Sequence, residues 1–282
     1  MEQHIIGHES ICSYLKARIE QGRLSHAYFF VGPAHIGKMT IARWFIDALH
    51  PSERIFMPAD GETSAITIED IRALRNRMSR STDDGGYRVV CISGVDVLTA
   101  QAGNALLKCV EEPPKHTIFI LCADNEEGVL KTLVSRCAVI RFSLVRFDIL
   151  SAALVKRECA DADVIARLSA GRPGYAIRLM EHPLYRAECE RAWETLKKCE
   201  TGAAWYRFVC VSELDAANVL DMAEMYAHRR LRECIEGRIP AEQSRTATVF
   251  LASLTAQTAA LRSTSVLQAS KSFLYRLLSP AP

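Results

Sequence analysis

The sequence lacks closely spaced cysteines, long apolar runs and a strong net charge. Its 282 residues include ten cysteines, but none of them forms a C-x-x-C pair. Structural zinc sites are usually built from such pairs, so we expect no metal site and favour buried free thiols. The longest apolar runs, such as Thr117–Ala123, are far too short to span a bilayer, so we expect no membrane segment.

Other absences narrow the class of protein. A net charge of +2 predicts no strong nonspecific attraction to nucleic acid, although a local basic stripe could still act. The opening residues, MEQHIIGHES, contain no basic segment followed by an apolar one, so we expect no secretory signal and a cytoplasmic location. Apolar residues make up 49% of the chain and charged residues 24%, a balance typical of a globular protein, and the length favours two or three domains.

The first half of the chain alternates between short apolar runs and helical patterns. This order predicts an α/β domain whose parallel sheet is covered by helices on both faces. After about Leu144 the strand patterns stop, and we expect helices from there to the end. The expected strands are Ala27–Val31, Arg88–Ile92, Thr117–Ala123 and Ala138–Phe142, and the expected helices of the first half are Lys38–Leu49, Thr67–Arg80 and Ala102–Val110.

A segment with the sequence GPAHIGKMT follows the first expected strand and opens a helix, as a phosphate-binding loop does. In such a loop Gly32 and Gly37 let backbone N–H groups face phosphate oxygens, and Lys38 reaches the outer phosphates. The next residue of an active loop supplies a hydroxyl to magnesium. Here it is Met39, whose thioether suits a hard cation poorly. Thr40 comes one residue after the position that needs a hydroxyl. On a helix one residue is a rotation of about 100°, so the Thr40 hydroxyl is expected to point elsewhere.

Three blocks of sequence resemble the clamp-loader subunits of bacterial DNA polymerase III, which are AAA+ proteins. They are the opening IIGHESICSYLKARIEQGRLSHAYFFVGPAHIGK, then NALLKCVEEPP at Asn104–Pro114, and TLVSRCAVIRF at Thr132–Phe142. Their order and spacing match the family over roughly residues 4–180. The resemblance implies a RecA-like AAA+ domain at residues 1–143, a small helical lid at 144–183 and an all-α collar for oligomerisation at 184–282.

The departures from the family's active ATPases fall on the catalytic positions. Where an active member has Asp-Glu after a strand, this chain has Ser93 and Gly94; Asp124 stands where a sensor threonine is usual, and Gly174 aligns with the second sensor's arginine. Phosphoryl transfer depends on positioned charges, so these losses predict no intrinsic ATPase activity. The pattern resembles delta-prime-type subunits, whose own site is inactive. The alternative is an autonomous AAA+ ATPase such as a gamma/tau-like motor, which would require acids at Ser93 and Gly94.

The resemblance also implies roles for single residues. Arg136, in the triplet Ser-Arg-Cys, would act in trans as an arginine finger on the ATP of a neighbouring subunit. Gly32, Gly37 and Lys38 would either bind ATP or ADP weakly or be a relic without a ligand, and both alternatives stay open. Arg72 would contact the phosphates of primed DNA, or belong to a solvated helix face. The implied partners are gamma/tau and delta subunits, the sliding clamp and primed DNA, and no cofactor is required.

Overall fold

The computed structural model describes residues 5–58, 66–79 and 86–197. Residues up to Ile149, together with Arg172–Gly174, form one compact unit, and a second unit begins at Leu150. Residues 198–282, which make up most of the predicted collar, lie outside the described residues, as does Arg80 of the predicted helix. The domain boundaries at 143 and 183 stay predictions.

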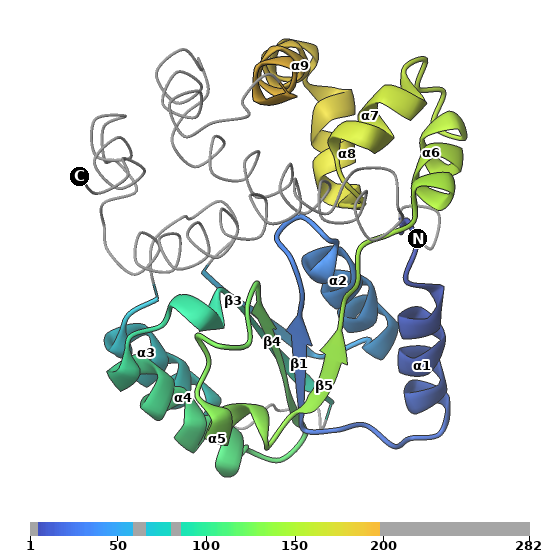
Figure 1. Cartoon of the computed structure of the whole chain (residues 1–282). Coiled ribbons are helices and arrows are strands. Elements are labelled where there is room, and N and C mark those ends of the chain that lie inside the picture. Colours follow the sequence, from blue (N-terminus) through green and yellow to red (C-terminus); the bar gives the residue numbers. More distant parts are fainter. Residues whose placement is uncertain (1–4, 59–65, 80–85, 198–282) are drawn as a thin grey trace, which may run out of the picture. The chain divides into compact units, whose positions relative to one another are not determined.

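The first unit is built on a five-stranded parallel sheet with the order β2-β3-β4-β1-β5 (Figure 1). The parallel α/β class is therefore confirmed, and four strands lie where the apolar runs predicted them. The sequence did not predict β2, because the segment ERIFM mixes charged with apolar residues and buries only Ile55. An edge strand needs no continuous apolar run. The strands are β1 (Ala27–Val31), β2 (Glu53–Met57), β3 (Arg88–Ser93), β4 (Thr117–Ala123) and β5 (Ala138–Arg141).

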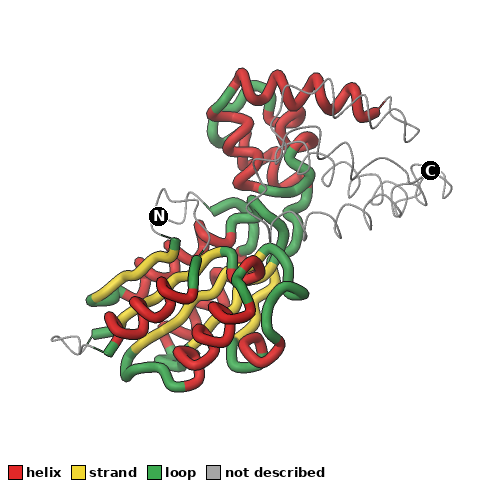
Figure 2. Tube along the Cα trace, turned by 90° about the vertical axis from the view of Figure 1, so that its left-hand side faces the viewer, coloured by secondary structure: helices red, strands yellow, loops and turns green. Residues whose placement is uncertain are grey.

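Helices cover both faces of this sheet, as Figure 2 shows from the side. Successive side chains of a strand point to opposite faces, so each central strand contributes to two cores. In β1, Phe29 packs with side chains from α3, α4 and α5, whereas Tyr28 and Phe30 pack with side chains from α1 and α2. The α-helices that cover the sheet in the described residues are α1 (Glu9–Glu20), α2 (Lys38–Leu49), α3 (Ile68–Met78), α4 (Ala100–Glu111) and α5 (Lys131–Val134).

Helix α3 begins at a reciprocal cap. The Thr67 hydroxyl accepts the Asp70 backbone N–H at 3.3 Å, and the Asp70 carboxylate accepts the Thr67 backbone N–H at 2.7 Å. These bonds satisfy two backbone donors that a helix start leaves unpaired. Ile71, Leu74 and Met78 form the face of α3 that is buried against the sheet.

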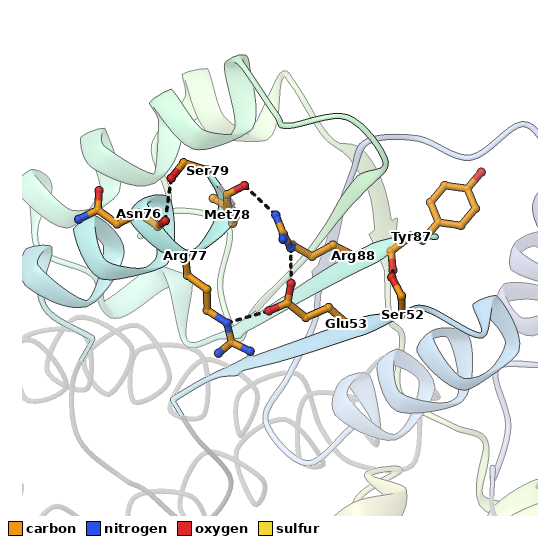
Figure 3. Close-up of polar contacts among 8 residues, drawn as sticks. All are labelled: Ser52, Glu53, Asn76, Arg77, Met78, Ser79, Tyr87 and Arg88. Carbon is orange, nitrogen blue, oxygen red and sulfur yellow. Dashed lines mark hydrogen bonds and ion pairs between the residues drawn. The ribbon is translucent and has the colours of Figure 1, made fainter. Parts of the chain in front are cut away.

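A buried arginine ties the edge strand β2 to β3 and α3 (Figure 3). Arg88 is 5% exposed; its guanidinium donates to the Glu53 carboxylate and, at 2.7 Å, to the Met78 carbonyl oxygen. Arg77 donates to the other Glu53 oxygen at 2.8 Å. Burial alone would raise the pKa of Glu53, but the hydrogen bonds and positive charges of Arg88 and Arg77 outweigh it and lower that pKa. Glu53 therefore stays ionised between two cations.

The described residues after β5 are helical. They form α6 (Phe147–Val155), α7 (Ala162–Leu168), α8 (Pro173–Glu181) and α9 (Pro183–Lys197). The Tyr175 hydroxyl lies 3.3 Å from both the Tyr185 hydroxyl and the Cys189 sulfur, and these contacts connect α8 to α9. In the part of the chain that the structure describes, no helix combines the length and the apolar character needed to cross a membrane.

Candidate functional site

The loop between β1 and α2 depends on two glycines. At Gly32 an added Cβ would lie 2.6 Å from the carbonyl oxygen of Phe142, so only glycine fits beside the end of β5. Gly37 has a φ of +103° and is the N-cap of α2, a backbone conformation that favours glycine. The structure therefore contains the strand–loop–helix unit that the sequence predicted, with Lys38 as the first residue of the helix.

The Lys38 side chain points into the loop that precedes α2. Its ammonium donates to the Gly32 carbonyl oxygen at 2.6 Å, to the Pro33 carbonyl oxygen at 2.9 Å and to the Asp124 carboxylate at 2.8 Å. The side chain is only 9% exposed. An ammonium group has three N–H donors, so these three partners occupy its whole donor capacity.

The sheet register brings Asp124 to this lysine. Val31 and Ala123 are partners in the parallel pair of β1 and β4, so Gly32 and Asp124 leave the sheet side by side. The carboxylate of Asp96 accepts the backbone N–H groups of Asp124 and Asn125, both at 3.2 Å, and so fixes the chain that carries Asp124. Burial, and then the negative charge of Asp124, raise the pKa of Asp96.

The positions that would bind magnesium hold unsuitable groups. Met39 packs into the core beneath the loop, with its sulfur 3.9 Å from the sulfur of Cys91, while Thr40 is exposed. At the end of β3, the Ser93 hydroxyl donates to the Met57 carbonyl oxygen at 3.4 Å, and Gly94 follows without a side chain. A hard divalent cation takes oxygen ligands, usually carboxylates and hydroxyls. These residues do not fit a magnesium-bound nucleotide.

Gly174, the residue expected at the second sensor position, has no room for a side chain. Gly174 belongs to the first unit, and its backbone N–H donates to the His35 carbonyl oxygen at 2.8 Å. An added Cβ at Gly174 would lie 2.9 Å from that oxygen. A side chain there would therefore have to displace the loop between β1 and α2.

His8 supports the same loop from α1's N-cap, a role that the sequence did not reveal. Its Nε2 lies 3.1 Å from the Ile36 carbonyl oxygen, and its ring makes a T-shaped contact with the ring of Phe142, with 5.1 Å between centroids. Burial lowers the pKa of His8, which favours the neutral imidazole.

Arg136 lies far from its own loop. It follows α5 and precedes β5, whereas Lys38 follows β1, and parallel strands all begin at the same edge of a sheet. The two residues are therefore at opposite ends of the strands, separated by roughly 15 Å, the length of a strand of four to five residues. The Arg136 guanidinium donates to the Thr132 carbonyl oxygen at 2.8 Å and pairs with Glu111 at 2.7 Å. Its side chain is 40% exposed.

Arg72 lies on the solvated side of α3, an element that carries neither Lys38 nor Arg136. Its side chain is 62% exposed, and its nearest acidic partner, Glu69, is 3.9 Å away. The site residues predicted from the sequence are thus in three places: the loop, the start of β5 and the surface of α3. Contact between Arg72 and DNA stays a prediction.

The sequence is similar to subunits of DNA polymerase III. Residues 47–146 match the family model described as DNA polymerase III, delta subunit. DNA polymerase III subunit gamma/tau of Mycobacterium bovis is 30% identical over 183 residues, which cover 57% of this chain and 32% of that protein. Subunit tau of Bacillus subtilis is 32% identical over 175 residues, covering 55% and 30% respectively. The chain thus spans about a third of the length of these relatives.

Solved structures of RuvB from Thermotoga maritima have a similar fold. One variant superposes with a TM-score of 0.52 at 17% identity, covering 98% of this chain and 96% of that one. Another gives a TM-score of 0.51 at 17% identity, covering 99% and 97%. The chain, with its five-stranded parallel sheet, therefore shares the fold of these RuvB structures.

Proposed function

We propose that this chain is a delta-prime-like subunit of a DNA polymerase III clamp loader, one that hydrolyses no ATP itself and supplies Arg136 in trans to a neighbouring subunit. The observation that carries the proposal is the contrast between the two edges of the sheet. At the carboxyl edge, Lys38 is occupied by its own loop and by Asp124, and the positions expected to bind magnesium are Met39, Ser93 and Gly94. At the amino edge, Arg136 is accessible at the surface.

The distance across the sheet supports action on another molecule. A guanidinium must lie within hydrogen-bonding distance of the transferring phosphoryl group to stabilise its charge. Since Arg136 is roughly a strand's length from Lys38, it does not reach a phosphate in its own loop. Its contact with Glu111 is a surface ion pair, which a phosphate at a subunit interface would replace.

The proposed partners are gamma/tau-type motor subunits and a delta subunit, with the sliding clamp and primed DNA as the substrates of the complex in the cytoplasm. Residues 1–143 would form the AAA+ domain, residues 144–183 the lid and residues 184–282 the collar that holds the ring together. Co-elution of the full chain with gamma/tau-type and delta subunits on size exclusion tests this assembly. Failure of the folded chain to co-elute with either would count against it.

A second candidate is a gamma/tau-like motor, which the names of the similar relatives favour. Such a motor must hydrolyse ATP with its own residues. The groups at Met39, Ser93 and Gly94 argue against it. Met39 and Gly94 offer no side-chain oxygen, and the Ser93 hydroxyl, which donates to the Met57 carbonyl oxygen, is not the carboxylate that a motor needs there.

The isolated chain is expected to release no phosphate from ATP in the presence of magnesium. Met39→Thr should not restore turnover, because the acids that would orient magnesium and water are still missing at Ser93 and Gly94. Phosphate release by the purified chain, with a gamma/tau-type subunit as the positive control, checks both statements. A rate typical of a working AAA+ motor would favour the second candidate.

A further inference from the structure

The ion pair between Lys38 and Asp124 bears on nucleotide binding, which is a separate question from hydrolysis. A loop without a magnesium ligand can still hold phosphate through its backbone N–H groups and its lysine. What decides binding here is whether Lys38 is available. All three of its donors are already used within the first unit, and its side chain is 9% exposed.

We infer that the Asp124 carboxylate takes the place of a nucleotide phosphate: it holds Lys38 inside the loop and excludes nucleoside triphosphates from it. An anionic oxygen 2.8 Å from the ammonium provides the charge-assisted hydrogen bond that a phosphate oxygen would provide. This inference is independent of the role proposed for Arg136.

Asp124 is held in place by the sheet and by Asp96. The strand register fixes the start of its segment beside Gly32, and the Asp96 carboxylate holds its backbone N–H. An added Cβ at Gly128 would lie 2.5 Å from the Asp96 carbonyl oxygen, so glycine at this position allows the two segments to lie close together. The backbone that carries the Asp124 carboxylate is therefore fixed beside Lys38.

Charge opposes the entry of a polyanion as well. A triphosphate approaching Lys38 would have to displace one carboxylate, Asp124, and would remain near a second, Asp96. Like charges brought within a few ångströms in a partly buried site repel strongly. Removal of the Asp124 charge should therefore both release the lysine and lower this repulsion.

The test compares the native chain with Asp124→Asn, which keeps the shape and removes the charge. Binding of a fluorescent ATP analogue is measured by anisotropy in EDTA, so that magnesium plays no part. We expect at least tenfold tighter binding by Asp124→Asn than by the native chain, and loss of that gain in Asp124→Asn combined with Lys38→Ala. Asp148→Asn, in an exposed ion pair with Arg146, is the matched control and should bind as the native chain does.

A second measurement needs no variant. Brief acetylation with acetic anhydride, read by mass spectrometry, should modify Lys38 far more slowly than the exposed Lys108, and millimolar ATP should leave the Lys38 rate unchanged. Rapid acetylation of Lys38, strong protection of it by ATP, or equal affinity of the native chain and Asp124→Asn would overturn the inference. Binding of ATP by the native chain without hydrolysis would also overturn this inference, but it would not contradict the proposed function.

Discussion

A clamp-loader complex that contains Arg136→Ala is expected to assemble normally and to load clamps more slowly than the unmodified complex. An arginine finger stabilises the charge that develops on the transferring phosphoryl group, and its removal lowers the rate by roughly 10³–10⁵-fold at the affected site. Only the one site next to this chain would be affected, so other motor sites would mask part of the loss in total ATPase. The rate of clamp loading is therefore the better measurement.

Three variants make this experiment specific. Arg141→Ala is the matched control, because Arg141 is also an exposed arginine in an ion pair, with Glu126. It should load clamps at the unmodified rate. Arg136→Lys should rescue poorly, since an ammonium group does not reproduce the planar fork of a guanidinium. Glu111→Gln, which weakens the resting partner of Arg136, should leave loading intact.

The stability of the isolated chain should change little in Arg136→Ala. The pair with Glu111 is partly exposed, and surface ion pairs contribute about 0–1 kcal/mol. Urea denaturation of the variant checks this expectation. Normal loading by a folded Arg136→Ala complex would refute the finger role, whereas a destabilised variant would show that Glu111 and Arg136 serve the fold.

Glu53→Ala is expected to cause the largest loss of stability among single changes to the polar contacts described above. It removes the carboxylate that binds the buried Arg88 and leaves that cation with only part of its hydrogen bonding. Breaking a fully buried pair costs about 3–5 kcal/mol. Because the Glu53 side chain is 23% exposed, we expect about 2–3 kcal/mol here, measured by urea denaturation.

The same carboxylate predicts how stability depends on pH. The pKa of Glu53 is lower in the folded chain than its ordinary value of 4.5, so its contribution is fully present above about pH 5 and is lost as the pH falls through the folded pKa. Glu53→Ala should therefore show a weaker loss of stability in acid than the native chain. Glu126→Ala, in an exposed pair, is the control and should cost less than about 1 kcal/mol. Equal costs for Glu53→Ala and Glu126→Ala would contradict the role of the buried arginine.

Continuous apolar runs made most of the sheet predictable from the sequence. Strand β4 (Thr117–Ala123) is buried along its whole length, so every residue of the run is apolar or small. The edge strand β2 was not predicted, because its single buried residue, Ile55, gives neither an apolar run nor an alternating apolar pattern. Lys38 was predicted from its loop motif, which is local in sequence. Its partner Asp124 is 86 residues away in the sequence, which showed only that Asp124 replaces the usual sensor threonine. The contact between Lys38 and Asp124 could not be predicted, because it depends on the register between β1 and β4.

The ion pair of Arg136 at the amino ends of the strands could not be predicted from the sequence either. The Ser-Arg-Cys triplet pointed to Arg136, but nothing in the sequence indicated that Glu111, at the end of α4, would be its partner. Both segments precede a strand, and only the parallel order of β4, β1 and β5 brings their ends to one edge. Contacts between loops at a sheet edge follow from topology, which single-sequence patterns do not contain.

The central claim is that this chain contributes to clamp loading without hydrolysing ATP itself. The most direct test measures the rate at which gamma/tau-type and delta subunits load a sliding clamp onto primed DNA with and without this chain. We predict that loading by the complex requires the chain, although the chain alone releases no phosphate. Loading at the same rate in its absence, or ATP turnover by the isolated chain at the rate of a working motor, would contradict the account.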